Sequence, residues 1–221
     1  MNITIKEGVD GARNAKGIAV IIDVLRAATV ASYLLDKGVT SIHPVATPEE
    51  AFDFKMKDEE VLLVGENKGI KIDGFDIGNS PSVIKTLNNL DGKKVVHRSS
   101  TGTQGLVNST NANQIIFGSF VSAQAILDFL KASQSEDITF VPMYALEDQL
   151  FAEYMVSKLK GETHSSLEEV KAKLEQHEWI LNSFLNPQND NFPEDDFHLA
   201  LEVDTFNFFP IIKDGKIVKS N

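Results

Sequence analysis

An aspartate and an arginine stand three residues apart where an apolar run ends, at Asp23 and Arg26. The run before them, residues 18–22, contains only Ile, Ala and Val, which is typical of a buried strand. A carboxylate at the end of such a strand could bind a metal ion or attack an electrophile, and a guanidinium in the next turn could hold a phosphate. The pair could instead be a helix cap and its ion-pair partner. The residues alone leave both interpretations open.

A long loop follows the third apolar run and carries two more carboxylates, Glu66 and Asp76. The loop extends over residues 65–81, and loops of this length without regular structure are more often functional than decorative. Glu66 and Asp76 could share with Asp23 a hard cation that prefers oxygen ligands, such as Mg²⁺. In the alternative interpretation, Asp76 only makes a side-chain turn.

The same loop ends in Asn79 and Ser80, directly before Pro81. A serine followed by a proline is typical of a helix N-terminus, so Ser80 is predicted to cap a helix. Asn79 and Ser80 could also donate hydrogen bonds to the ester oxygen of a substrate or to metal-bound water.

A second candidate for anion binding follows the fourth apolar run, where small hydroxyl residues and glycines precede a helix. Free backbone N–H groups and the positive end of a helix dipole would suit a phosphate or a sulfonate there. The candidate residues are Thr101, Gly102, Thr103, Gln104 and Gly105. The stretch is not a P-loop, because the Gly-Lys-Ser/Thr ending is absent. Many connecting loops have the same composition, so this motif is weak by itself.

A further pair of acids, Glu147 and Asp148, stands at the head of an amphipathic stretch. Acids in a first helical turn stabilise the helix dipole, and Asp148 could equally complete a carboxylate cluster that binds a metal. The five histidines are scattered without ligand spacing, so a zinc site is not expected.

These candidate residues follow the strands of a predicted α/β fold with a mostly parallel sheet, because β-branched runs alternate with helical periodicity. The predicted strands are residues 18–23, 41–45, 61–65, 93–98, 114–118 and 137–143. The predicted helices are residues 24–37, 48–57, 83–87 and 122–132. Ligands of such sheets bind beyond the carboxyl ends of the strands. We therefore expect the candidate residues to converge at one edge.

The C-terminal third differs in composition. Residues 161–200 contain nine acids and two bases, and apolar residues at helical spacing predict an amphipathic acidic helix over 167–184. Residues 186–193 are expected to form a loop, and Asp214-Gly215 predicts a β-hairpin within 206–218. We expect one layered α/β/α domain over residues 1–221, with the acidic helix and the C-terminal strands packed on it.

Composition excludes several classes of function. The chain has 221 residues and a net charge of −11, without a basic stretch, which disfavours binding to duplex nucleic acid or to anionic membranes. The absence of cysteine excludes disulfide scaffolds and thiolate nucleophiles. No stretch has the apolar core of a signal peptide or of a membrane span, so a cytoplasmic protein is expected.

Taken together, these motifs resemble the 2-phosphosulfolactate phosphatase family. The resemblance rests on residues 23–27, 65–66, 74–81, 99–103, 118–120 and 147–148. The string Gly-Phe-Asp-Ile-Gly-Asn-Ser-Pro at 74–81 is the most diagnostic of them, because it is long and unusual. The resemblance covers residues 17–160 closely and continues more weakly to Pro210.

The resemblance implies Mg²⁺-dependent hydrolysis of a phosphate monoester of a small anionic metabolite, which in the family is 2-phosphosulfolactate, in coenzyme M biosynthesis. Asp23 would be the nucleophile or a metal ligand, and Arg26 with residues 101–105 would hold the phosphoryl oxygens. The predicted metal ligands are Asp23, Glu66, Asp76 and Asp148. The alternative is a non-catalytic domain that binds a phosphorylated or sulfonated metabolite. The acidic helix would either cover the domain or form a homodimer contact.

Overall fold

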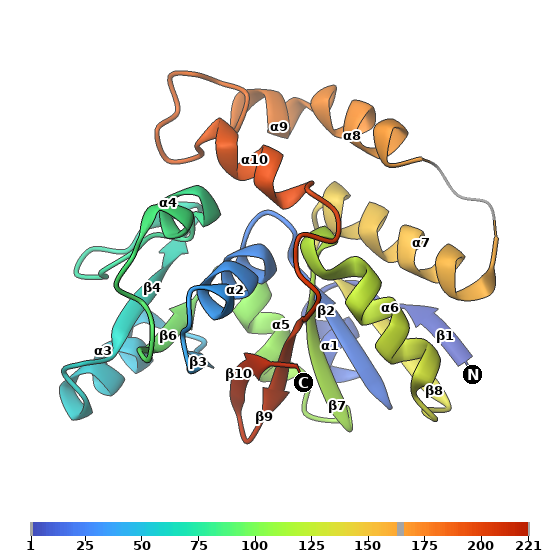
Figure 1. Cartoon of the computed structure of the whole chain (residues 1–221), viewed down its shortest axis with the longest axis horizontal. Coiled ribbons are helices and arrows are strands. Elements are labelled where there is room, and N and C mark those ends of the chain that lie inside the picture. The colour runs from blue at the N-terminus through green and yellow to red at the C-terminus, as the bar shows by residue number, and fades with distance from the viewer. Residues whose placement is uncertain (1, 163–165, 221) are drawn as a thin grey trace.

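The computed structural model describes residues 2–162 and 166–220, and ten strands within them form one mixed sheet (Figure 1). The strands are β1 (Asn2–Ile5), β2 (Ile18–Ile22), β3 (Ser41–Pro44), β4 (Leu62–Asn67), β5 (Ile70–Lys71), β6 (Lys94–Arg98), β7 (Gln114–Gly118), β8 (Asp137–Pro142), β9 (Pro210–Lys213) and β10 (Lys216–Lys219). Their order across the sheet is β1-β8-β2-β7-β9-β10-β3-β6-β4-β5.

Helices connect most of the strands, so the predicted α/β class is confirmed. They are α1 (Gly8–Arg13), α2 (Ala27–Asp36), α3 (Pro48–Lys57), α4 (Pro81–Thr86), α5 (Gly102–Asn108), the 3₁₀ helix η1 (Phe120–Ser122), α6 (Ala123–Ala132), α7 (Leu146–Lys160), α8 (Leu167–Glu175), α9 (Glu178–Asn182) and α10 (Glu194–Ala200). None of the helices within these described ranges is long and apolar enough to cross a bilayer.

The sheet contains two groups of parallel strands, the C-terminal hairpin that joins them, and the short strand β5, which pairs antiparallel with β4. One group is β1-β8-β2-β7 and the other is β3-β6-β4. The strands β9 and β10 pair antiparallel with each other, and β9 also pairs antiparallel with β7 and β10 with β3. The turn of this hairpin is at Asp214 and Gly215, both with positive φ, which confirms the predicted hairpin.

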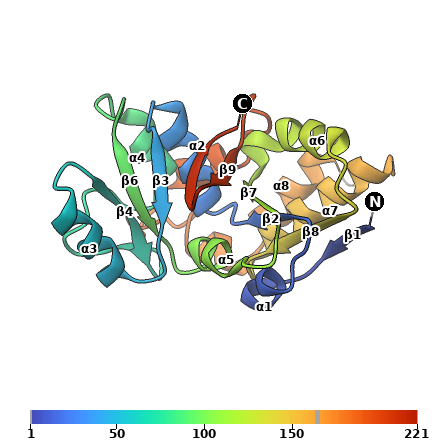
Figure 2. The ribbon, with the colours of Figure 1, turned by 90° about the horizontal axis from the view of Figure 1, so that it is seen from below.

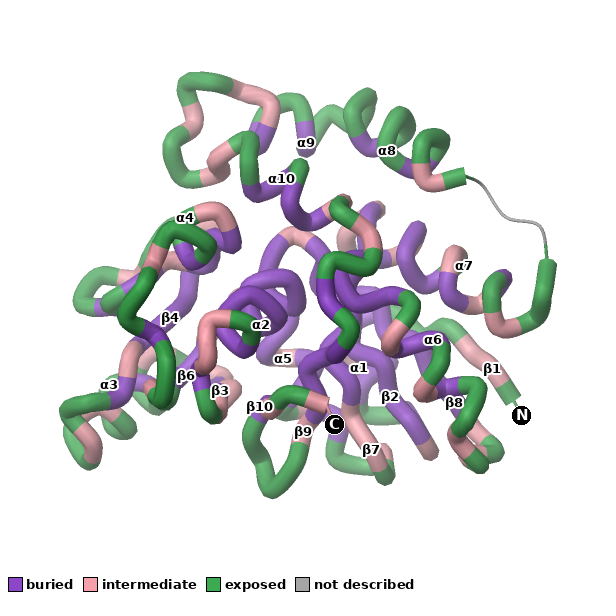
Figure 3. The backbone as a smooth tube through the Cα atoms, in the orientation of Figure 1, coloured by how far each residue is buried: buried purple, intermediate pink, exposed green. Residues whose placement is uncertain are grey.

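Helices cover both faces of the sheet. Along β2, the side chains of Ala19 and Ile21 belong to one apolar cluster, and those of Ile18, Val20 and Ile22 belong to another. Viewed from below, α1 and α5 lie on one side of β2 and β8, and α6 lies on the other (Figure 2). Both β2 and α2 are buried along almost their whole length, whereas α3 and α8 are largely exposed (Figure 3). Burial on both faces explains why β2 is uniformly apolar.

The acidic segment folds over one end of the sheet. The helices α8, α9 and α10 lie across the top of the molecule in Figure 1, and we call residues 166–200 the cap. Apolar residues of the cap, among them Leu174, Ile180 and Phe197, join the cluster that also contains Phe151 and Met155 of α7. The cap therefore covers the domain, which was one of the two predicted roles of this segment. The homodimer stays a prediction.

Most of the predicted elements agree with the structure, including all six predicted strands. The predicted helix over 167–184 is wrong, because the chain turns out of α8 at Gln176 and His177, and a separate helix, α9, begins at Glu178. The helix expected after the Ser/Thr/Gly stretch is α5, whereas the short elements β1, α1, β5 and α10 were not predicted. Residues 163–165 of the acidic segment lie outside the described residues.

Candidate active site

A pocket of about 330 Å³ opens at the carboxyl ends of β2 and β4, beneath the cap. Its lining residues come from both groups of parallel strands and from the cap: Asp23, Leu25, Arg26, Glu66, Lys68, Gly69, Asn79, Ser100, Thr101, Trp179 and Phe192. Five of the predicted site residues are among them, namely Asp23, Arg26, Glu66, Asn79 and Thr101. The expected convergence at one edge of the sheet is therefore found for these five.

Asp23 follows β2 directly and is almost fully buried. Its Oδ1 accepts a hydrogen bond from the backbone N–H of Ala27 at 2.8 Å, and its Oδ2 accepts one from the Thr101 hydroxyl at 2.7 Å. Burial raises the pKa of Asp23, although these hydrogen bonds oppose the effect, and the charge of Glu66 raises this pKa further. The N-cap position of α2 belongs to Arg26 and has no side-chain cap bond, so Asp23 is not the N-cap; its carboxylate accepts from the first N–H of the helix and borders the pocket.

Glu66 lies near the end of β4 and is also buried. Its Oε1 accepts from the N–H of Ser100 at 2.5 Å, and its Oε2 accepts from the Ser100 hydroxyl at 3.0 Å and from the N–H of Gly69 at 2.5 Å. These bonds hold the carboxylate in one orientation between two loops. Because the charges of Glu66 and Asp23 interact unfavourably, a cation between them would stabilise both.

Arg26 borders the same pocket, but its guanidinium is also engaged by the cap. It donates to the Asp196 carboxylate at 2.9 Å and to the carbonyl oxygen of Asn191 at 3.0 Å. A third bond at 2.9 Å reaches the carbonyl oxygen of Gly69. The side chains of Arg26 and Asp196 are both buried, so this ion pair lies inside the protein.

The predicted anion loop at 101–105 contributes less than expected. Thr101 lines the pocket and fixes Asp23, as described above. Gly102 is required for packing, since a Cβ there would lie 2.7 Å from Oδ2 of Asp23. Thr103 exchanges hydrogen bonds with Ser99, the Gln104 amide donates to the carbonyl oxygen of Ala46, and Gly105 packs on β2 and Met143. Thr103, Gln104 and Gly105 therefore shape the start of α5, and they do not line the pocket.

Asn79 lines the pocket, whereas Ser80 caps α4. The side chain of Asn79 lines the pocket, and its Oδ1 lies 2.9 Å from Nε2 of His97. Burial lowers the pKa of His97 to about 4, so a neutral ring that donates from Nε2 fits this contact. The bond orients the Asn79 amide. Ser80 accepts from the N–H of Val83, which confirms the predicted cap, and its hydroxyl donates to Asp196.

Two of the four predicted metal ligands, Asp76 and Asp148, do not line the pocket. Asp76 is not part of the pocket that Asp23 and Glu66 share, and its Oδ2 accepts from the N–H of Leu63 at 2.8 Å and lies 3.5 Å from Nζ of Lys55. It thereby ties the long loop to β4.

Asp148 is fully enclosed and connects two strand ends. Its two oxygens accept from the N–H groups of Val24 at 2.8 Å and Met143 at 3.2 Å. Burial and the charges of Glu147 and Asp23 raise the pKa of Asp148, while these two N–H donors lower it. Within residues 2–162 and 166–220, no three Asp, Glu, His or Cys side chains gather in a way that could hold a metal ion. The predicted centre of four carboxylates is therefore wrong as a whole, and Asp23 and Glu66 are the pair that the pocket retains.

Glu147 is not one of the predicted metal ligands, but it differs from its neighbour Asp148 in having a buried carboxylate oxygen without a partner in the described part of the chain. It is buried, and its Oε1 has no hydrogen-bond partner among the described residues. Burial and the charge of Asp23 raise the pKa of Glu147 to about 8. Since both acids stand together at the head of α7, the sequence could not show which of them has its oxygens satisfied.

Without divalent ions, the free energy of unfolding should depend on the charge of Glu147. Because the pKa in the folded state, about 8, lies above the ordinary value of 4.5, the contribution of Glu147 is fully present below pH 4.5 and is lost as the pH rises through 8. The slope approaches about 1.4 kcal/mol per pH unit for one proton. Glu147→Gln should flatten the fall of Tm between pH 5 and 9 and raise Tm at pH 8.

Glu153→Gln is the matched control, because Glu153 is exposed on the same helix. This control should follow the Tm profile of the wild type. Identical Tm profiles for the wild type and for Glu147→Gln would show that Glu147 is charged throughout this pH range.

Seven pocket-related residues were not among the predicted site residues, and three of them are Leu25, Gly69 and Ser100. Trp179 and Phe192 come from the cap, Lys68 comes from the turn between β4 and β5, and Asp196 is the ion-pair partner of Arg26. Because residues 161–200 are rich in acids, a buried acid such as Asp196 was not expected among them. No local signal identifies Asp196, since the neighbouring residue Asp195 is also an acid on the same helix and is exposed.

Comparisons with known proteins place the sequence in one family. The profile of the family described as 2-phosphosulpholactate phosphatase matches residues 3–215. A protein of Carboxydothermus hydrogenoformans named probable 2-phosphosulfolactate phosphatase is 39% identical over 153 residues, which are 66% of this chain and 63% of that protein. A protein of Thermoplasma volcanium with the same name is 30% identical over 213 residues, 93% of each chain. A protein of Clostridium perfringens with this name is 37% identical over 151 residues, 64% of this chain and 60% of that protein.

The fold is a mixed α/β sheet with a pocket at its strand ends that two carboxylates and two cationic side chains line. Because the family profile extends over nearly the whole chain, this protein belongs to the 2-phosphosulpholactate phosphatase family. The match spans less than two thirds of the length of the Carboxydothermus and Clostridium relatives.

Proposed function

We propose that this protein hydrolyses the phosphate monoester of a small anionic metabolite, and that 2-phosphosulfolactate is the first substrate to test. In the net reaction, one water molecule is consumed and the bond between phosphorus and the ester oxygen breaks. The products are inorganic phosphate and the free alcohol. The observation that carries the proposal is the shared pocket, which the buried carboxylates of Asp23 and Glu66 line together with Arg26, Lys68 and Asn79. The family membership supports the reaction class.

We propose that a divalent cation such as Mg²⁺ binds in this pocket. The carboxylates of Asp23 and Glu66 are hard oxygen donors, they lie on one pocket, and the charge of Glu66 raises the pKa of Asp23. We propose that these two residues hold the ion. When bound, the ion would neutralise the carboxylates and polarise the phosphoryl oxygens.

The side chains around the pocket supply the remaining functions. Thr101 and the N–H of Ala27 fix both oxygens of Asp23, so the carboxylate is preorganised as a ligand or as the attacking group. Arg26 and Lys68 provide positive charge for the phosphoryl oxygens and for a second acidic group of the substrate. The Asn79 amide, oriented by His97, can donate to the ester oxygen. Trp179 and Phe192 form an apolar wall that limits the access of water.

The test is phosphate release from a panel of phosphomonoesters, with Mg²⁺ and with EDTA. The panel should contain 2-phosphosulfolactate, 2-phosphoglycerate, 3-phosphoglycerate and a neutral sugar phosphate. We expect Mg²⁺-dependent release with a kcat of about 1 s⁻¹ or more for at least one compound with a second acidic group, and slower release from the neutral sugar phosphate.

Tight binding of a panel compound without release would contradict hydrolysis. It would favour the alternative of a non-catalytic domain that binds a phosphorylated or sulfonated metabolite. Binding can be followed independently of release through the fluorescence of Trp179, which lines the pocket and is the single tryptophan of the sequence.

A further inference from the structure

Asp196 is a buried carboxylate on the inner side of the cap, and both of its oxygens are engaged. Its Oδ2 accepts from the Arg26 guanidinium at 2.9 Å. Its Oδ1 accepts from the hydroxyl groups of Ser80 at 2.8 Å and Ser82 at 2.6 Å, and from the N–H of Ser82 at 2.9 Å. Asp196 therefore joins three parts of the fold, namely the cap, the start of α4 and the turn that carries Arg26.

The cap determines where the guanidinium of Arg26 lies. Besides Asp196, the carbonyl oxygen of Asn191 accepts from it at 3.0 Å, and the ring of Phe192 lies 4.8 Å from its central carbon. The carbonyl oxygen of Gly69 accepts from the opposite side. A guanidinium has five N–H donors. These contacts use three of them, and the same group borders the pocket.

The cap also fits closely over the turn that carries Gly69. A Cβ at Gly69 would lie 2.0 Å from the Phe192 ring, and the φ of Gly69 is positive. Phe192 thus lies against both this turn and the guanidinium of Arg26. The position of the cap and the position of Arg26 are thus parts of one packing arrangement.

We propose that Asp196 is a positioning residue, which holds the guanidinium of Arg26 at the pocket and makes the affinity for a phosphoryl group depend on the cap. This inference rests on the proposed function, in which Arg26 binds the phosphoryl oxygens. A buried ion pair is weak evidence of a contribution to stability, because apolar residues of similar size would often stabilise the fold as well. The buried carboxylate of Asp196 is explained if the guanidinium of Arg26 must be held in one orientation.

The test measures binding of inorganic phosphate, in the presence of Mg²⁺, through the fluorescence of Trp179. The variants are Asp196→Asn, Arg26→Gln and the double variant. Asp196→Asn should raise the Kd for phosphate about tenfold, which corresponds to the loss of one well-placed charge-assisted hydrogen bond. If Asp196 acts through Arg26, the double variant should bind phosphate no more weakly than Arg26→Gln alone.

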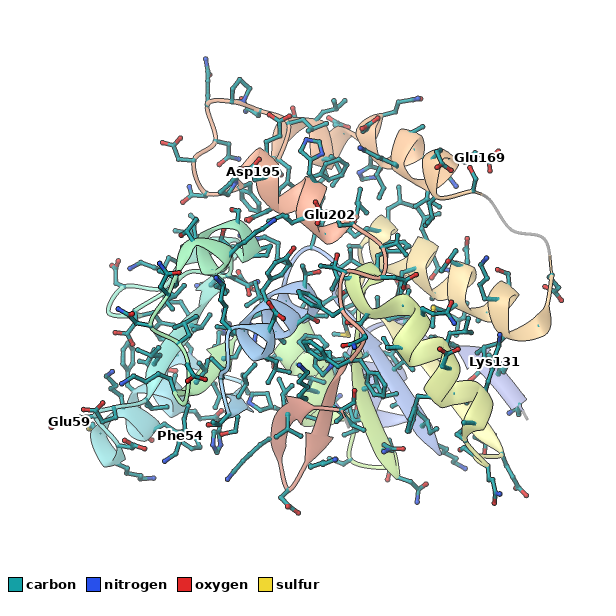
Figure 4. The ribbon with its side chains drawn as sticks, in the orientation of Figure 1. Phe54, Glu59, Lys131, Glu169, Asp195 and Glu202 are labelled. Atoms are coloured by element: carbon teal, nitrogen blue, oxygen red, sulfur yellow. The ribbon has the colours of Figure 1, made fainter. Side chains whose placement is uncertain are left out.

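Asp195→Asn is the matched control, because Asp195 is the neighbouring residue on α10 and is exposed on the outer side of the molecule (Figure 4). It should leave the Kd within about twofold of the wild type, as is usual for surface substitutions. An unchanged Kd for Asp196→Asn would overturn the proposal. A further loss of affinity in the double variant relative to Arg26→Gln would overturn it too, since a general structural role would weaken binding in either background.

Ser82→Ala covers the case in which Asp196→Asn does not fold. It removes the hydroxyl donor to Oδ1 of Asp196 but keeps both charges and the N–H bond from residue 82. We expect a two- to fivefold rise in the Kd for phosphate, about the effect of one neutral hydrogen bond. An unchanged Kd would overturn the proposal. A wild type that binds phosphate but releases none from the ester panel would reject hydrolysis, and the comparison of Kd values would still decide the role of Asp196.

Discussion

Asp23→Asn is expected to lower kcat by about a thousandfold or more, which is typical when a charged group that acts on the transition state is lost. As a metal ligand or as the attacking group, residue 23 needs the negative charge that asparagine lacks. A phosphate-release assay under saturating Mg²⁺ measures the effect. Turnover within tenfold of the wild type would show that the carboxylate of Asp23 takes no part in the chemistry.

The same substitution should leave the fold intact. The Asn side chain has nearly the same shape, and its oxygen can still accept from the N–H of Ala27 or from the hydroxyl of Thr101. Because burial raises the pKa of Asp23 above 3.8, the stability that this group contributes is present at low pH and is lost as the pH rises through the shifted value. In metal-free buffer at pH 7, the Tm of Asp23→Asn should therefore equal or exceed that of the wild type.

Asp36→Asn provides the control for Asp23→Asn. Asp36 is exposed at the opposite end of α2, so this variant loses the same charge far from the strand ends. It should keep the kcat of the wild type. A loss of kcat in both variants would point to net charge and not to the pocket.

Removal of divalent ions is the second change with a large expected effect. Treatment with EDTA should reduce kcat by about a thousandfold, and added Mg²⁺ should restore it, because the paired carboxylates would otherwise repel the phosphoryl group. Glu66→Gln should raise the Mg²⁺ concentration for half-maximal activity at least about tenfold. Full activity in EDTA would remove the cation from the mechanism.

Glu59→Gln is the matched control for Glu66→Gln. Glu59 lies just after α3 and projects from the surface of the molecule (Figure 4). Its removal should leave the Mg²⁺ dependence unchanged. An equal shift in both variants would indicate an unspecific effect of the lost charge on the attraction of cations.

Local patterns were sufficient to predict the frame of this fold. Residues 18–22 are apolar and β-branched because both faces of β2 are covered, and this burial is visible as an uninterrupted run. The cap at Ser80 could be predicted because a cap is decided within four residues. The carboxyl ends of parallel strands share an edge, so Asp23 and Glu66 could be placed together from their positions after β2 and in β4.

Contacts between distant segments could not be predicted in the same way. The partner of Arg26 lies 170 residues away in the cap, and nothing in the local pattern of Asp196 distinguishes it from the exposed Asp195. Asp148 was predicted as a metal ligand, although it binds the N–H groups of Val24 and Met143, because hydrogen bonds to a distant backbone leave no trace in composition. The sequence thus indicates which charged residues stand at strand ends, and only the packed structure shows which of them have their oxygens satisfied.

A crystal structure of the protein soaked with Mg²⁺ and inorganic phosphate tests the central claim most directly. We predict one Mg²⁺ ion bound by the carboxylates of Asp23 and Glu66 at about 2.1 Å, with a phosphate beside it that is hydrogen-bonded to Arg26. A phosphate or a metal ion that binds elsewhere, with Asp23 and Glu66 left facing only solvent, would contradict the account.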